Sequence, residues 1–256
     1  MAHVVKMDVD IAPMDLRNNK ELPTALFCWS GGKDSAYCLH KVITENLFDV
    51  KYLLTTINDS VQRISMHGVR EELLDKQIGA IGIPALKVRI KEGTHGEYET
   101  LMETALLQAK SEGVKYVIFG DIFLKDLRAY REQNLAKVDM VGVFPLWEMN
   151  TSELIWKFID EGFKTVTCCI NDGYFDESWV GKEIDSDFMN DLPDNVDPCG
   201  ENGEYHTFCY QGPLFNKPIT FALGEKLYKP LEYALDDVCQ SPVQTKGFWY
   251  CDLIPN

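Results

Sequence analysis

Short apolar runs alternate with segments of helical periodicity from residue 22 to about residue 121. Apolar runs with the length of buried strands lie at residues 24–29, 50–57, 85–90 and 115–120. Segments that repeat apolar side chains at helical spacing lie at residues 35–46, 69–80 and 97–111. Alternation of this kind is typical of parallel strands joined by crossover helices. The pattern therefore predicts an α/β fold with a parallel sheet.

The first predicted helix, at residues 35–46, illustrates the helical periodicity. Ala36, Leu39, Val42 and Ile43 fall on one helical face. We expect all four side chains to be buried against the sheet.

The pattern changes after Asp121. Residues 124–137 are charged and helical, residues 140–147 are apolar, and a helix is predicted at 151–162. Asn150 and Glu153 form a capping pair for that helix, and a strand is predicted at 164–170. The remainder is rich in loops and β-structure. We expect a flexible arm over residues 1–20, a first domain over 21–130 and a second, smaller domain over 131–256.

A glycine-containing loop joins the first predicted strand to the first predicted helix. It reads Ser30-Gly31-Gly32-Lys33-Asp34-Ser35. Adjacent glycines let backbone N–H groups approach an anion, and the helix N-terminus adds about half a positive charge. Two serine hydroxyls and the Lys33 ammonium complete a predicted phosphate site. The alternative is a strand-to-helix turn that binds nothing.

This loop differs from the kinase-type phosphate loop. Phe27 occupies the position of the first glycine of that loop, and Asp34 follows Lys33 where a Ser or Thr is required.

In a nucleotide-binding open sheet, ligands lie at the carboxyl ends of the strands. The loop, Asn58, Gly120 and Asp121 would meet there. Asp121 would hold Mg²⁺ or orient a substrate; capping of the following helix is the alternative.

A second group of polar side chains lies in the later part of the chain, between Asp197 and Phe208. In an extended strand Glu204, His206 and Phe208 share one face, so a carboxylate and an imidazole would project together. Asn202-Gly203 is also a strong hairpin signal, and polar residues around a hairpin need no function.

Composition narrows the possible functions. The chain has 256 residues, of which 45% are hydrophobic, and a net charge of −15. Such a charge repels nucleic acid, so no nucleic-acid partner is predicted. Since no apolar run of about 18 residues occurs and the N-terminus lacks a signal-peptide pattern, no membrane partner is predicted. The eight cysteines show no metal-binding or redox spacing, which favours reduced thiols in the cytoplasm.

Three motifs resemble those of the diphthine-ammonia ligase family of ATP pyrophosphatases. They are the Ser30–Ser35 loop, Gly120-Asp121-Ile122 followed by Arg128-x-x-Arg131-Glu132, and the segment from Gly200 to Thr207. The resemblance spans roughly residues 22 to 220. It implies an adenine nucleotide alpha-hydrolase domain, HUP-like and Rossmann-like, followed by a smaller α+β C-terminal domain. Residues 21–130 would then bind ATP and residues 131–256 the substrate.

The resemblance also implies an activity. Such an enzyme adenylates a substrate carboxylate, releases pyrophosphate, and couples ammonia with release of AMP, using ATP and Mg²⁺. The archetypal acceptor is diphthine on elongation factor 2. This chain has His206 where the family pattern has a glutamate, so another acceptor, such as a corrinoid precursor, is an alternative. A non-catalytic ATP-binding sensor is a further alternative, and a homodimer is a possible assembly.

The motifs carry the predicted roles onto individual residues. The residues predicted to bind the nucleotide are Ser30, Gly31, Gly32, Lys33, Asp34, Ser35, His67 and Gly120. The predicted catalytic residues are Lys33, Asp34, Asp121, Glu204 and His206. The residues predicted to bind substrate are Arg128, Arg131, Glu132, Gly200, Glu201, Asn202, Gly203, Glu204, His206 and Thr207. Asp121 is the predicted Mg²⁺ ligand. A buried histidine and a surface salt bridge are the alternatives for His67 and Arg128, respectively.

Overall fold

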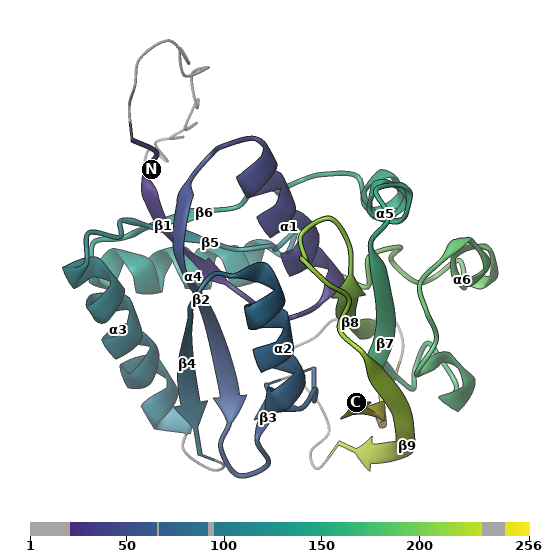
Figure 1. Cartoon of the computed structure of the whole chain (residues 1–256). Helices are drawn as coiled ribbons and strands as arrows, with labels where there is room; N and C mark the ends of the chain where they lie inside the picture. The colour runs from purple at the N-terminus through teal and green to yellow at the C-terminus, as the bar shows by residue number, and fades with distance from the viewer. Residues whose placement is uncertain (1–20, 66, 92–94, 232–243) are drawn as a thin grey trace, which may run out of the picture.

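The described part of the chain covers residues 21–256 apart from 66, 92–94 and 232–243, in a computed structural model (Figure 1). The predicted arm over residues 1–20 lies outside the described residues.

The first sheet, sheet A, is mostly parallel. Its strands are β1 (Thr24–Cys28), β2 (Asp49–Asn58), β3 (Arg63–Ile64), β4 (Ala85–Ile90), β5 (Tyr116–Ile118) and β6 (Val141–Val143). The parallel strands lie in the order β4-β2-β1-β5-β6, and the short β3 pairs antiparallel with the end of β2. The strand order reverses direction between β1 and β5. In open α/β sheets this switch point is where ligands bind.

Helices cover both faces of sheet A (Figure 1). They are α1 (Lys33–Thr44), α2 (Glu71–Ile81), α3 (His95–Ser111) and α4 (Lys125–Lys137). Successive residues of β1 point to opposite faces: Ala25 and Phe27 join the core beneath α1 and α2, whereas Leu26 joins the core beneath α3 and α4. The predicted α/β fold is confirmed.

One residue of the predicted apolar face of α1 is not buried. Ala36, Leu39 and Val42 are inaccessible, but Ile43 is 42% exposed. Ile43 lies in the last turn of the helix, one residue before its end at Thr44.

Sheet A continues past residue 130. The helix α4 spans that position, and β6 pairs with β5 through Val141–Val143. Structural elements of the first sheet therefore extend to residue 143.

The second sheet, sheet B, is antiparallel. Its strands are β7 (Lys164–Asn171), β8 (Tyr205–Gln211), β9 (Phe221–Pro230) and β10 (Gly247–Pro255), in the order β8-β7-β10-β9. Helices α5 (Thr151–Asp160) and α6 (Ser186–Asp191) and the 3₁₀ helix η1 (Glu177–Trp179) accompany it. The predicted cap of α5 is confirmed, because Asn150 Oδ1 accepts a hydrogen bond of 3.0 Å from the Glu153 N–H. In the described part of the chain, no helix combines the length and apolarity that a membrane crossing needs.

One apolar core runs from α1 and α2 into sheet B. The strand β8 lies beside these two helices (Figure 1). Phe163, just before β7, packs edge-on against Tyr37 of α1 and stacks on Phe158 of α5. The two sheets therefore share buried side chains instead of meeting at a hydrated linker.

A charged contact at the far end of the interface joins β10 to sheet A. The Asp252 carboxylate accepts hydrogen bonds from Arg63 at 2.9 Å and from Arg70 at 2.5 and 3.0 Å. Hydrogen bonding from Arg70, followed by that from Arg63, lowers the pKa of Asp252 from 3.8 to about 2.

We expect Asp252→Asn to lower the free energy of unfolding by about 1–2 kcal/mol at pH 7, because it leaves two arginines facing each other without a counter-charge. Since the pKa of Asp252 is depressed in the folded state, the lost stabilisation is fully present above about pH 4 and fades as the pH falls toward 2. Urea unfolding at pH 7 and at pH 2.5 measures both effects.

Asp139→Asn is the matched control, since Asp139 is 97% exposed beside Lys110. Its effect should stay within about 0.5 kcal/mol. An equal effect of the two substitutions at pH 7 would contradict a role for Asp252 in joining the sheets.

Candidate active site

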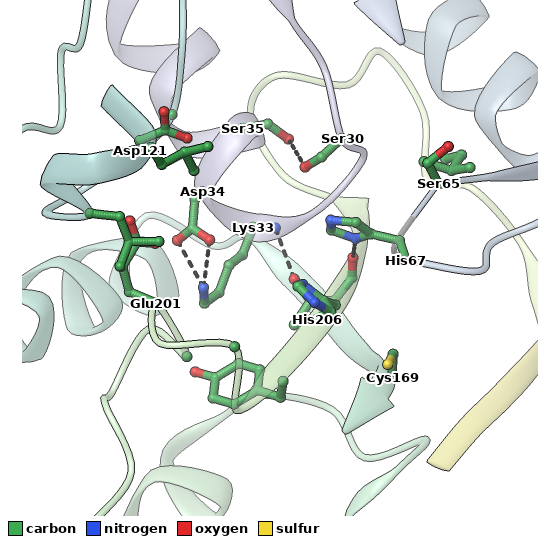
Figure 2. Close-up of a pocket in the computed structure, with 18 of the residues that line it drawn as sticks. Ser30, Lys33, Asp34, Ser35, Ser65, His67, Asp121, Cys169, Glu201 and His206 are labelled. Atoms are coloured by element: carbon green, nitrogen blue, oxygen red, sulfur yellow. Dashed lines mark hydrogen bonds and ion pairs between the residues drawn. The ribbon is translucent and has the colours of Figure 1, made fainter. Parts of the chain in front are cut away.

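A cavity of about 1030 Å³ opens where the carboxyl ends of β1, β2 and β5 meet sheet B. Most of the residues singled out in the sequence contribute to its wall. Those that line it are Ser30, Lys33, Asp34, Ser35, His67, Gly120, Asp121, Arg131, Gly200, Glu201, Asn202, Gly203, Glu204, His206 and Thr207. Figure 2 shows Asp34, Asp121 and Glu201 at one side of this cavity and His67, His206 and Cys169 at the other.

The two glycines of the loop are required by close approach. Gly31 has φ = +80°, and a Cβ atom there would lie 2.7 Å from Gln77 Oε1. A Cβ on Gly32 would lie 2.8 Å from the His67 ring and 3.1 Å from the Thr207 carbonyl oxygen. Any larger residue would push the loop away from its neighbours.

Gln77 of α2 holds the loop from one side. This fully buried amide accepts from Trp29 Nε1 at 3.1 Å and donates to the carbonyl oxygens of Gly31 at 2.9 Å and Cys209 at 2.6 Å. Gln77 was not among the residues predicted to form the site. The sequence feature that could have indicated it is a polar residue four positions after Leu73, on an otherwise apolar helical face.

Strand β8 holds the loop from the other side. The Cys209 N–H donates to the Gly31 carbonyl at 2.9 Å, and the Lys33 N–H donates to Thr207 Oγ1 at 3.0 Å. Thr207, predicted to bind substrate, is therefore a direct support of the loop. The phosphate-type loop depends on both halves of the chain for its conformation.

The start of α1 is prepared for an anion. Its N-cap residue, Gly32, supplies no side-chain cap. The hydroxyls of Ser30 and Ser35 lie 3.1 Å apart, and Ser35 Oγ donates to the Gly32 carbonyl at 3.0 Å. The Lys33 N–H is already donated to Thr207, so the other N–H groups of the first turn, the helix dipole and two hydroxyls provide the donors that a phosphate group needs.

Lys33 is buried, with 3% of its side chain exposed. Its ammonium contacts both Asp34 carboxylate oxygens, at 2.8 and 2.7 Å, and donates to the Cys199 carbonyl. Burial opposes its charge, but Asp34, Cys199 and Glu201 together more than offset burial, and the pKa of Lys33 is raised. The site thus keeps a fixed cation beside the loop.

Asp121 lies at the end of β5 and is paired with Arg131 of α4. Arg131 Nε lies 2.6 Å from Asp121 Oδ2, and the guanidinium stacks on Phe119 at 4.4 Å. Burial raises the pKa of Asp121, and Arg131 opposes that shift. Gly120 lets the residue after β5 approach the start of α1 closely, since a Cβ there would lie 3.2 Å from the Asp34 backbone.

Glu201 reaches the same end of the cavity from the loop before β8. One of its oxygens accepts the Ile122 N–H at 2.7 Å. Burial, and then the nearby Asp34 charge, raise the pKa of Glu201 to about 7. Its charge therefore changes near neutral pH.

The carboxylates at this end of the cavity do not form a complete metal site by themselves. No group of three or more His, Cys, Asp or Glu residues that could hold a metal ion occurs among the described residues. Mg²⁺ needs only one or two protein carboxylates when substrate phosphates and water complete its coordination. Asp34 and Asp121, at the mouth of the loop, fit that smaller requirement.

His67 and His206 form a pair at the opposite side of the loop. Their ring centroids lie 4.9 Å apart. The Thr207 carbonyl can only accept, so His67 Nδ1 donates to it at 2.9 Å and its Nε2 carries the free lone pair. Burial lowers the pKa of both rings, and that of His206 falls to about 3 with the help of His67. Both imidazoles are therefore neutral at pH 7.

Glu204 is 1% exposed and its carboxylate is occupied by the turn that precedes β8. It accepts from the Asp197 N–H at 2.9 Å, the Asn202 N–H at 2.8 Å and Asn202 Nδ2 at 3.1 Å. The predicted hairpin signal at Asn202-Gly203 corresponds to this turn. Gly200, with φ = +67°, lets the Tyr205 ring pack against the turn.

Five predicted positions are not among the residues that line the cavity. They are Gly31 and Gly32, whose loop does line it, and Arg128, Glu132 and Asn58. Arg128 pairs with Glu132 at 2.8 Å and stacks on Phe144 and Trp147 on the outer side of α4. This is the surface salt bridge that the sequence left open. Asn58 lies beyond the cavity because β2 continues to that residue and then turns into β3.

Some residues that line the cavity belong to none of the three sequence motifs. Helix α3 adds Tyr98 and Met102, the residue after β5 adds Phe119, and sheet B adds Cys169, Lys229 and Tyr250. They belong to ordinary helix and strand patterns, and only the pairing of distant segments brings them together.

Two conservative substitutions should change stability in opposite directions. Because the pKa of Glu201 is raised in the folded state, the free energy of unfolding falls as pH rises from 4.5 to about 7. Glu201→Gln removes that cost and should stabilise the protein by about 1–3 kcal/mol at pH 8, with little effect at pH 4.

Glu204→Gln places an amide N–H₂ against three donors and should destabilise the protein by about 1–3 kcal/mol. Urea unfolding at pH 4 and pH 8 measures the effects of both substitutions. An effect of Glu201→Gln that does not change with pH would contradict the raised pKa of Glu201.

The comparisons with known proteins agree with the motifs. Family models of the diphthamide synthase N-terminal domain and C-terminal domain match residues 24–140 and 150–235. The diphthine-ammonia ligases of Bos taurus and Homo sapiens are each 26% identical to this chain over 74% of its length and 79% of their own. The diphthine-ammonia ligase of Danio rerio is 24% identical over 74% of this chain and 83% of its own. With both domain models matched in order along the chain, the protein belongs to the diphthamide synthase family.

Proposed function

We propose that the protein is an ATP-dependent ligase that adenylates a substrate carboxylate and then couples ammonia to it, forming AMP and pyrophosphate. The observation that carries the proposal is the loop from Ser30 to Ser35, hydrogen-bonded to β8 and open to one cavity shared by both sheets. Its relatives bear the name diphthine-ammonia ligase. At about 1030 Å³ the cavity is at the upper end of the roughly 300–1,000 Å³ usual for single ligands, which suits two substrates.

The chemistry explains why such a loop is needed. A carboxylate resists ammonia because its charge repels nucleophiles and oxide is a poor leaving group. Attack of a carboxylate oxygen on the α-phosphorus of ATP breaks the bond to the β-phosphate and releases pyrophosphate. Ammonia then attacks the acyl carbon, loses a proton, and AMP leaves with the electron pair of the broken C–O bond.

The loop would stabilise the charge that develops on pyrophosphate. The N–H groups at the start of α1 other than that of Lys33, together with the hydroxyls of Ser30 and Ser35, would donate to it, and the Lys33 ammonium would supply a nearby positive charge. These groups are held by Gln77 and β8 before the nucleotide arrives. Little reorganisation would then be required during the reaction.

Mg²⁺ bound with ATP would neutralise phosphate charge. Asp34 and Asp121 are the residues that would hold it. Arg131 would keep Asp121 oriented, and Glu201, beside them, would attract ammonium to the same end of the cavity.

The nucleoside would lie against the apolar side of the cavity. Tyr98, Met102 and Phe119 form that wall, next to the carboxyl ends of β1 and β5. His67, whose Nε2 can only accept, would orient a hydroxyl donor near the loop.

The proposal allows two candidates for the acceptor carboxylate. Diphthine on elongation factor 2 is the first candidate, because the relatives carry that name. The neutral His206, where the family pattern has glutamate, favours testing a second acceptor carboxylate such as a corrinoid acid beside it.

Product analysis tests the proposal directly. Purified protein is incubated with ATP, Mg²⁺, ammonium and each acceptor in turn, and nucleotides are separated by chromatography. AMP and pyrophosphate that appear only with an acceptor support the ligase. ADP as product, or tight ATP binding without turnover for every acceptor, would favour a phosphotransferase or a sensor.

Lys33→Met should lower AMP formation about 100–1,000-fold, because it removes a fixed cation beside the leaving pyrophosphate. Asp34 is 30% exposed and becomes hydrated in the variant, so the free energy of unfolding should change by less than about 2 kcal/mol. Lys41→Met, on the same helix but paired with Glu45 outside the cavity, is the control and should keep full activity. Equal activity of the two variants would remove Lys33 from the mechanism.

A further inference from the structure

His67 lies directly against the phosphate-type loop. A Cβ atom on Gly32 would lie 2.8 Å from Cε1 of the His67 ring, so the imidazole and the loop backbone leave no room for a side chain between them. Cε1 is bonded to both ring nitrogens, which brings Nε2 close to this contact. The ring lines the same cavity as Ser30 and Ser35 (Figure 2). His67 is therefore placed to contact an anion that fills the loop.

The Thr207 carbonyl holds the His67 ring in an orientation that allows its charge to change. Nδ1 donates to this oxygen at 2.9 Å. A hydrogen is present on Nδ1 in this neutral tautomer and also in the imidazolium. Protonation would add a hydrogen at Nε2 and leave the bond to Thr207 in place. Nε2 can therefore change from acceptor to donor without any movement of the ring.

The charged and titratable groups around His67 come from its own loop and from three other elements. They are Arg63 and Arg70, both paired with Asp252, Lys33 and Asp34 on α1, His206 on β8, and Tyr250 on β10, which packs against the Gly68 backbone. Burial is the largest influence on His67 and lowers its pKa. Lys33 acts in the same direction, whereas the Thr207 carbonyl and the Asp34 charge favour the imidazolium.

Pyrophosphate in the loop would reverse this balance at His67. It carries several negative charges, and a nearby opposite charge favours the protonated form of a histidine. His206 differs, because burial, His67 and Lys33 all disfavour its cation. With the two ring centres 4.9 Å apart, a proton on one imidazole also opposes a proton on the other. The pair would therefore take up one proton, and His67 would hold it.

We propose that His67 is a pH-dependent ligand of pyrophosphate: with pyrophosphate in the loop, Nε2 takes up one proton from the solvent and donates it in a hydrogen bond to a phosphate oxygen. In the ATP complex the same nitrogen would accept from a nucleoside hydroxyl, so the change of partner follows the departure of AMP. Pyrophosphate is then held at low pH and released as the pH rises. The inference rests on the proposed function, which makes pyrophosphate the anion in the loop.

Calorimetric titration of the whole chain with pyrophosphate, in the presence of Mg²⁺, tests the inference. The variant is His67→Asn, because the asparagine amide places an N–H₂ group where Nδ1 stands and has nothing in place of Nε2. At pH 6 the variant should bind pyrophosphate at least about tenfold more weakly than the wild type. At pH 8.5, where His67 is neutral, the two proteins should bind it equally well. Titrations at pH 7 in buffers of different ionisation enthalpy should show that the wild type takes up about one proton more than the variant.

His40→Asn is the matched control. His40 lies on α1 outside the cavity lining, with Nε2 at 3.5 Å from Glu161, so the variant should bind pyrophosphate as the wild type does at both pH values. The chain has five histidines, and their ¹³C NMR signals give a second readout. The signal that is lost in His67→Asn should titrate at higher pH once pyrophosphate is added.

Three results would overturn the inference. They are the absence of pyrophosphate binding to the wild type, an equal loss of affinity in His67→Asn at pH 6 and pH 8.5, which indicates only a supporting role for the ring, and a His67 titration that pyrophosphate leaves unchanged. Failure of the proposed function gives a different result. A protein that never forms AMP but binds pyrophosphate with this dependence on His67 would refute the ligase and leave the pyrophosphate site standing.

Discussion

The site depends on two hydrogen bonds between the phosphate-type loop and a strand of the other sheet. Gly31 accepts from the Cys209 backbone, and Lys33 donates its backbone N–H to Thr207. The partners are 178 and 174 residues apart in sequence, so only the folded chain can supply them. Gln77 ties the same carbonyl to α2. Loop conformation, helix position and the placement of β8 are therefore one arrangement, and the chemistry proposed for the cavity requires all three.

Local patterns account for the part of the molecule that could be predicted. In sheet A the strands β1, β4 and β5 are each followed directly by a helix, so burial on one side of each of these segments could be read from spacing alone. The Ser30–Ser35 loop is equally local, because its glycines, hydroxyls and helix start are contiguous. Ile43 shows the limit of that method: a helical face defines which residues are adjacent, but the packing of the folded chain decides which of them are covered.

Pairing between distant segments accounts for what could not be predicted. Nothing in the sequence around Cys169, Lys229 or Tyr250 indicates that they share a face with His206, because the register of antiparallel strands joined by long connections is not written in local periodicity. Glu204 and Arg128 show the converse. Both stand in motifs, yet one is occupied by backbone N–H groups of its own turn and the other by Glu132 and two aromatic rings.

The attachment of the loop to β8 has a consequence for how the two halves of the chain depend on each other. A fragment that ends near residue 140 would contain every residue of the loop and the whole of the strand and helix around it. It would lack Thr207 and Cys209, and Gly31 would keep its left-handed backbone without the donor that stabilises it. Under the proposed function, nucleotide affinity would thus depend on both sheets, and any lesion that unravels the C-terminal sheet would weaken ATP binding at a loop more than a hundred residues upstream.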